Sequence, residues 1–187
     1  MKNILILFLT ISLLSSCDKT KRETTQTDLE IETEKKQDTI YNYWELSPDT
    51  ISYHKKFKIL NKDYSLDLKT FSLNDSLIVR NLGQERDQVY LDYSHTMVTD
   101  LALLTDSIVD KKRIDRTDFK QALNQEFYKE CNLFSTTIDS IVGNTFYLTS
   151  DLAVPDTDNQ WRIWYSIKVT NNRLGNIEIK ETNYVGL

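Results

Sequence analysis

The chain has 187 residues, and its 23 Lys and Arg against 28 Asp and Glu give a formal net charge of -5. An acidic chain without a basic cluster is a poor ligand for nucleic acid, because binding there depends on neutralising phosphates. The sequence also lacks a glycine loop that could cradle phosphate groups, so it predicts no nucleotide and no other cofactor.

The N-terminus reads as an export signal. Lys2 precedes an apolar run over residues 4–14, which is too short to span a bilayer but typical of a secretory signal peptide, here residues 1–16. The run ends in Leu14-Ser15-Ser16-Cys17, which resembles the lipobox of bacterial lipoproteins. That resemblance implies cleavage before Cys17, fatty acids such as palmitate on Cys17, and attachment to the inner or outer membrane of the cell envelope. The alternative is an ordinary secretory signal with a chance cysteine.

Residues 17–38 form the next segment. Residues 18–38 carry 12 charged residues in 21 and almost no large apolar ones. Such a segment cannot bury enough surface to offset its ordering entropy, so we expect a disordered tether behind the lipidated cysteine.

Residues 39–187 are predicted to form a single β-rich domain, because period-two alternation dominates them. The expected inward positions are Tyr64, Leu66, Leu68, Leu77, Val79, Val89, Leu91, Tyr93, Phe146, Leu148, Trp161, Ile163, Tyr165, Ile167, Val169, Ile177 and Ile179. The chain has only four glycines and two prolines, so its turns should rely on Asn and Asp. We therefore expect a mostly β fold, β-rich α+β, in which an antiparallel sheet or sandwich carries one amphipathic helix. Residues 41–44 (YNYW) are either the first strand or an adhesive patch at the end of the tether.

The predicted helix starts at Thr117 as N-cap. Phe119, Leu123, Phe127 and Cys131 recur at a spacing of four, which places them on one helical stripe. Cys131 should then be buried and inert, although a free or intermolecular thiol is the alternative if Cys17 is acylated.

The run from Arg116 (RTDFKQAL) to "NLFSTTIDSIVGNTFYLTSDLAVPDTDNQWRIWYSIKV" resembles an uncharacterised domain of small lipoproteins in gut-type Gram-negative bacteria. The likeness covers roughly residues 95–180 and rests on Asp118-Phe119, Phe146 with Leu148, and Pro155 with Thr157-Asp158. It implies a fold and a location but no chemistry.

Candidate catalytic and metal-binding residues are few. His54 and His95 are the only histidines, and either could serve an envelope hydrolase, although no Gly-x-Ser-x-Gly elbow accompanies them. Asp156 and Asp158 could contribute oxygen ligands to a cation, but the EF-hand pattern fails around them. We predict no metal site and no catalytic residue; a polar turn is the expected role of Asp156 and Asp158.

Alternation places Trp164 with Arg162 and Lys168 on the sheet face opposite Trp161. An indole among polar neighbours is typical of a binding surface for a protein or a glycan. The alternative is a second core face. The sequence thus favours a lipid-anchored, non-enzymatic protein of the cell envelope that binds an envelope protein or glycan or supports an assembly, with a hydrolase or a plain spacer as alternatives.

Overall fold

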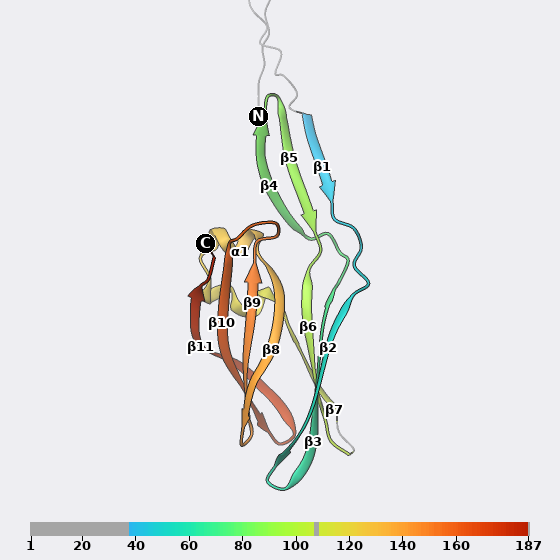
Figure 1. Cartoon of the computed structure of the whole chain (residues 1–187), viewed down its shortest axis with the longest axis vertical. Helices are drawn as coiled ribbons and strands as arrows, with labels where there is room; N and C mark the ends of the chain where they lie inside the picture. The colour runs from blue at the N-terminus through green and yellow to red at the C-terminus, as the bar shows by residue number, and fades with distance from the viewer. Residues whose placement is uncertain (1–37, 107–108, 187) are drawn as a thin grey trace, which may run out of the picture. The chain divides into compact units, whose positions relative to one another are not determined.

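The computed structural model describes residues 38–106 and 109–186 of the chain, and these form a mostly β fold of three sheets (Figure 1). The predicted signal peptide, Cys17 and all of the predicted tether before Asp38 lie outside the described residues. In the part that is described, no helix is both long and apolar enough to cross a bilayer.

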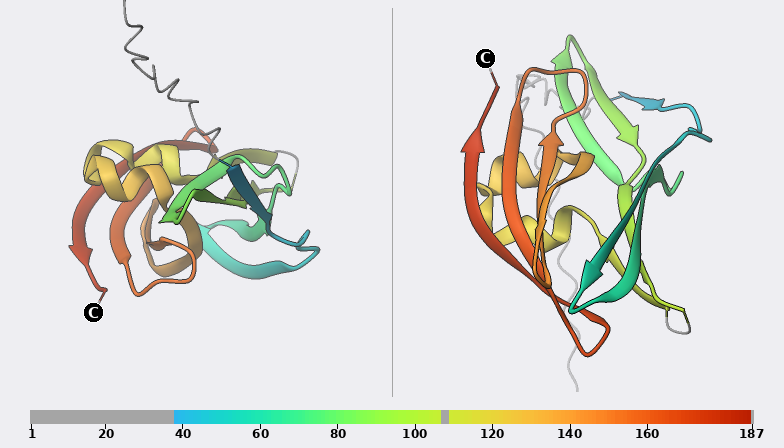
Figure 2. Two further views of the ribbon diagram at one scale, coloured as in Figure 1. Left: turned by 90° about the horizontal axis from the view of Figure 1, so that it is seen from above. Right: turned by 60° about the horizontal axis from the view of Figure 1, so that its bottom comes forward.

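Two four-stranded antiparallel sheets form the body of the fold. One, the β3 sheet, has the order β2 (Thr50–Ile59), β3 (Lys62–Ser72), β6 (Met97–Leu104) and β7 (Val109–Ile114). The other, the β10 sheet, has the order β11 (Arg173–Tyr184), β10 (Gln160–Thr170), β9 (Thr145–Ala153) and β8 (Asn132–Val142). Their inner faces share one apolar core, as in a β-sandwich (Figure 2).

The core confirms most of the predicted inward positions. Side chains from both sheets that are at least 98% buried include Leu66, Leu68, Leu101, Leu103, Leu133, Phe146, Leu148, Leu152, Ile163, Tyr165 and Ile167. Alternation therefore identified the inner faces of β3, β9 and β10 correctly, because each of these strands has one apolar and one polar face.

The third sheet, here the β5 sheet, has the order β1 (Asp38–Tyr43), β5 (Gln88–Ser94) and β4 (Ile78–Glu85). β4 and β5 form a hairpin that lies between β3 and β6 in the sequence, although β3 and β6 are neighbours in their own sheet. β1 pairs with β5 in parallel. The expectation of antiparallel pairing thus holds for all the other strand pairs but not for β1. Because β1 carries residues 41–43, most of YNYW is indeed a first strand.

The inward faces of β4 and β5 were predicted wrongly. On β5, Val89, Leu91 and Tyr93 are only half-buried, whereas Asp92 and Ser94 are buried. Leu77 and Val79 are 70% and 42% exposed, whereas Ile78 is fully buried and Arg80 is 5% exposed. Arg80 can lie inside because it forms an ion pair with the buried carboxylate of Asp92 on β5. A buried charge with a partner therefore overrides the apolar alternation.

The single helix was also predicted wrongly. The structure has a 3-10 helix η1 (Arg116–Ala122) capped by Asp115, and then a separate helix α1 (Gln125–Glu130) capped by Asn124. The stripe Phe119, Leu123, Phe127 and Cys131 is nevertheless buried, and Phe119 packs on Tyr165 of β10 with ring centroids 5.2 Å apart. η1 contacts β11, and α1 contacts β4 and places Phe127 against Trp161 of β10, with ring centroids 6.1 Å apart, so both helices lie beside the β10 sheet (Figure 2).

The turns rely on asparagine, as predicted. Asn61, Asn74, Asn171 and Asn172 all have a positive φ, between 52° and 65°. Asparagine adopts this left-handed conformation more readily than other residues that carry a side chain, which is why so few glycines suffice.

Candidate functional site

An open apolar groove, here the Trp44 groove, lies where the segment between β1 and β2 passes the start of β8 and the loop between β9 and β10. Its volume is about 460 Å³. Three apolar side chains that line it are well exposed: Trp44 by 37%, Ile51 by 66% and Phe134 by 68%. Its other lining residues are Glu45, Ser47, Ser72, His95, Met97, Asn132, Leu133, Ser135, Ala153, Val154, Pro155, Asp156, Thr157 and Gln160. Exposed apolar side chains around a concavity with a few polar groups are typical of a binding site.

The segment that forms one wall of the groove is held by Asn74. The Ser47 backbone N–H donates to Asn74 Oδ1 at 2.9 Å, and Asn74 Nδ2 donates to the Ser47 carbonyl oxygen at 3.1 Å. These two hydrogen bonds resemble those between paired strands. They fix the segment that leads from β1, which pairs with β5, to β2, which pairs with β3. The groove wall is therefore held in place by hydrogen bonds and not by burial.

The opposite wall is held by Asn132 at the start of β8. Asn132 Oδ1 accepts from the Met97 backbone N–H at 2.9 Å, and its Nδ2 donates to the His95 carbonyl oxygen at 2.6 Å. Phe134 follows at a register shift between Leu133 and Ser135. A bulge of this kind re-aims side chains, and here it accompanies an exposed aromatic ring at the groove.

A buried ion pair joins the elements around the groove. Arg80 Nη2 lies 2.7 Å from Asp92 Oδ2, and the side chains are 6% and 2% exposed. Asp92 also accepts hydrogen bonds from Asn42 Nδ2 at 2.6 Å and from Trp44 Nε1 at 3.1 Å. Arg80 in turn donates to the carbonyl oxygen of Pro155 in the β9–β10 loop. The pair thus connects β1, the β4–β5 hairpin and the loop.

The same contacts determine the ionisation of Asp92. Burial alone would raise its pKa, but the hydrogen bonds from Arg80, Asn42 and Trp44 and the positive charge of Arg80 outweigh burial. The pKa of Asp92 consequently lies below its ordinary value, and the carboxylate stays ionised.

His95 lines the groove, but its side chain has a structural role. It is 6% exposed, its Nδ1 accepts from the Ser76 backbone N–H at 3.1 Å, and its Nε2 donates to the Glu45 carbonyl oxygen at 3.2 Å. Both ring nitrogens are thus engaged by neighbouring groups of the chain. A general base needs a free lone pair towards its substrate, so this arrangement does not favour His95 as a hydrolase base.

His54 lies elsewhere, on the outer face of the β3 sheet. Its Nδ1 is 2.5 Å from Asp67 Oδ1, and the two side chains are 55% and 34% exposed. A carboxylate that orients an imidazole is one element of a hydrolase site, but His54 does not line the groove. A hydrolytic role for His54 stays a prediction.

The predicted binding face around Trp164 lies on the outer side of the β10 sheet, outside the apolar core. Trp164 is half-buried and Lys168 is exposed, while Arg162 forms an ion pair with Asp151 at 2.7 Å. The three residues share a face, as predicted, but none of them lines the Trp44 groove. Ligand binding there stays a prediction.

The loop with Asp156 and Asp158 is built as a polar turn. Thr157 Oγ1 donates to the Val154 carbonyl oxygen at 2.9 Å, and Asp156 lies 4.0 Å from the Arg80 guanidinium. Across residues 38–106 and 109–186, no three His, Cys, Asp or Glu side chains gather closely enough to hold a metal ion. The positive charge that Asp156 faces is therefore the guanidinium group of Arg80.

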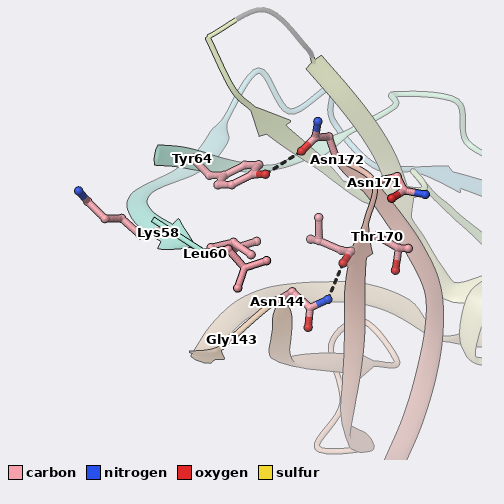
Figure 3. A pocket seen from close by; sticks show the side chains of 10 residues that line it. Lys58, Leu60, Tyr64, Gly143, Asn144, Thr170, Asn171 and Asn172 are labelled. Atoms are coloured by element: carbon pink, nitrogen blue, oxygen red, sulfur yellow. Dashed lines mark hydrogen bonds between the residues drawn. The ribbon is translucent and has the colours of Figure 1, made fainter. Parts of the chain in front are cut away.

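A second cavity of about 580 Å³ lies at the opposite ends of the strands, where the β2–β3, β8–β9 and β10–β11 turns meet (Figure 3). Tyr64 donates to Asn172 Oδ1 at 2.7 Å, and Asn144 Nδ2 donates to the Val169 carbonyl oxygen at 2.7 Å. The polar side chains that line this cavity form hydrogen bonds mainly with other groups of the cavity wall. The Trp44 groove, with three exposed apolar side chains, is the better candidate site.

Sequence reasoning singled out only part of this groove. The sequence points to Trp44 within YNYW, to His95 and to the loop with Pro155, Asp156 and Thr157, all of which line the groove. It does not point to Ile51 or Phe134, because nothing local indicates that these distant segments meet. The chain matches no protein-family model, and it matches no curated protein either. The likeness of residues 95–180 to a lipoprotein domain stays a prediction.

Proposed function

We propose that the protein is a lipid-anchored, non-catalytic binding protein of the cell envelope, which holds an envelope protein or glycan in the Trp44 groove. The observation that carries this proposal is the group of exposed apolar side chains Trp44, Ile51 and Phe134 around one concavity. Exposed rings can stack on the apolar face of a sugar or enclose an apolar side chain of a protein, and the polar groups beside them can orient either ligand.

A binding role without catalysis agrees with the chemistry of the groove. Its one histidine has both nitrogens in hydrogen bonds to the backbone, and its nearest buried charges, Arg80 and Asp92, neutralise each other. These groups hold the walls together, so they are not available to activate water or a nucleophile.

The anchor is tested by labelling cells with a palmitate analogue. We expect label on the full chain and its loss in Cys17→Ala, because the lipobox resemblance implies fatty acids on Cys17. The chain should then be found in the membrane fraction, and Cys17→Ala should leave it. Absence of label from the unaltered chain would contradict the anchor.

The groove is tested by cross-linking the lipidated full chain in membranes and recovering its partners. Phe134→Ser should abolish recovery of a bound protein or glycan, because it removes the most exposed ring of the groove. The matched control is Val142→Ser, since Val142 lies on the same strand, is 63% exposed and does not line the groove. Equal recovery with both variants would refute the groove as the binding site.

A further inference from the structure

The outer edge of β1 is unpaired within the described residues, because β1 has β5 as its one partner strand there. The Asp38 backbone N–H donates to the Asp87 carbonyl oxygen at 3.2 Å, and the Trp44 N–H donates to the Tyr93 carbonyl oxygen at 2.9 Å. Backbone groups of successive residues point to alternate sides of a strand. Even-numbered residues of β1 therefore bond to β5, and Thr39, Tyr41 and Tyr43 direct their N–H and C=O groups outwards.

The other free edges carry features that oppose pairing with a further strand. The sequence of β2 contains His54 and three lysines, β7 has Lys111, Lys112 and Arg113, and β11 has two basic and two acidic residues. β4 has a register shift between Asn81 and Gly83, and β8 has two. Charges and bulges are the usual protection of edge strands. β1 has one charged residue, Asp38, and an unshifted register, so among the described strands its edge is the one open to another strand.

One face of the β5 sheet adds exposed aromatic surface beside this edge. Tyr41 and Tyr43 are 56% and 59% exposed, and both rings lie against Tyr93, with centroid distances of 6.2 and 4.7 Å. Val79 on β4, in register with Tyr93, is 42% exposed. Residues 41–43 are thus at once the first strand and an exposed aromatic patch.

We propose that two copies of the chain associate through antiparallel pairing of their β1 strands, centred on Tyr41. In this register Tyr41 lies opposite Tyr41 of the second copy, and Tyr43 lies opposite Thr39. All of these residues direct their backbone groups outwards, so each opposed pair can exchange two hydrogen bonds. The two β5 sheets then become one continuous sheet with its tyrosines on one face, and aromatic pairs across strands are stabilising.

Charge favours a second copy at this edge in particular. Each copy contributes only Asp38 to the paired strands, and in the Tyr41-centred register Asp38 falls opposite the uncharged Trp44. Self-pairing of β2 or β7 would instead bring lysines and arginine of both copies together, which destabilises a strand pair. The proposal depends neither on the anchor nor on a ligand in the groove.

The register is tested by disulfide cross-linking of the full chain in intact cells with a mild oxidant, whichever cell fraction then contains the chain. In Tyr41→Cys the two Cα atoms would lie about 5.5 Å apart, as in a hydrogen-bonded strand pair, which a disulfide can span. In Ile40→Cys they would lie roughly 8 Å apart, from the strand spacing and rise, which is too far. We expect most Tyr41→Cys chains to migrate as dimers, and Ile40→Cys to stay at the level of the unaltered chain, in which Cys17 and Cys131 set the background.

A control separates pairing from random collision. Tyr53→Cys places a thiol at a residue that is 45% exposed on β2, so it should give only background dimer. Dimer formation at equal levels in Tyr41→Cys, Ile40→Cys and Tyr53→Cys, or at background in Tyr41→Cys, would overturn the proposal.

A second variant tests the edge itself. Thr39→Pro, added to Tyr41→Cys, removes an outward N–H while the β1–β5 hydrogen bonds remain, and proline is tolerated on edge strands. It should reduce the cross-link to background, whereas Thr39→Ala should leave it unchanged, with circular dichroism confirming that both fold. A cross-link that survives Thr39→Pro at full level would mean that the backbone edge is not the contact.

Discussion

At the scale of single residues, the Arg80–Asp92 pair has the largest consequence for stability. Both side chains are buried, and removing one partner leaves the other as an unpaired charge in a medium of low dielectric constant. We expect Asp92→Asn to lower the free energy of unfolding by about 3–5 kcal/mol at pH 7, measured by urea denaturation.

The matched control is Asp100→Asn. Asp100 forms an ion pair with Arg113 at 2.7 Å, but these side chains are 38% and 48% exposed, so solvent screens the pair. Its loss should cost at most about 1 kcal/mol. Equal costs for Asp92→Asn and Asp100→Asn would contradict the importance of burial.

The pH dependence of stability follows from the lowered pKa of Asp92. A carboxyl whose pKa is lower in the folded than in the unfolded chain stabilises the fold fully above the unfolded value of about 3.9, and the contribution is lost as pH falls through the folded value. The difference in unfolding free energy between the unaltered chain and Asp92→Asn should therefore shrink in urea titrations taken from pH 5 towards pH 2. A difference that stays constant would contradict the lowered pKa.

Cys131 illustrates the opposite effect of burial. Its side chain is fully buried, and burial raises the pKa of its thiol to about 12, although nearby Arg116 favours the thiolate. A thiol that stays protonated is a poor nucleophile. The predicted burial of Cys131 is confirmed, even though Cys131 follows a shorter helix than the one expected, and its inertness stays a prediction.

At the scale of elements, the two faces of β10 differ, because one packs on the core and the other faces outwards. Trp161 packs on the core, with ring centroids 6.1 Å from Phe127 and 5.9 Å from Tyr184, whereas Trp164 faces outwards among polar neighbours. We expect Trp161→Ala to cost about 3 kcal/mol of unfolding free energy. Trp164→Ala should cost about 1 kcal/mol or less, because it leaves the core intact. A loss of 3 kcal/mol or more in Trp164→Ala would exclude its face as a free binding surface.

Sequence reasoning succeeded for elements whose two faces differ in polarity, such as β3, β9 and β10. It failed on β4 because the inward Arg80 depends on Asp92, twelve residues away, and an apolar pattern cannot represent such a pair. It joined η1 and α1 into one helix because the side chains at a spacing of four are all buried, although Asn124 ends one turn and caps the next. Burial was therefore predictable here, but backbone geometry was not.

At the scale of the whole molecule, the mostly β class was predictable and the strand order was not. Alternation along a strand says nothing about its neighbour, so neither the parallel β1–β5 pair nor the separate β5 sheet could be inferred. The Trp44 groove escaped prediction for the same reason, since Trp44, Ile51 and Phe134 come together only through that strand order. Trp44 is the groove residue that lies in YNYW, the segment for which the sequence offers an adhesive patch as one interpretation.

The parallel pairing of β1 with β5 also has a mechanical consequence. A tension applied to the chain ahead of Asp38 would pull β1 along its own axis, while β5, which continues into β6, resists in the opposite direction. The force would then act on all hydrogen bonds between β1 and β5 at the same time, in shear geometry, and would not break them one after another. Forced unfolding is governed by the unfolding rate and not by the equilibrium stability. Because the shear geometry requires several hydrogen bonds to break together, β1 should slow unfolding when the chain is pulled from the side of Asp38.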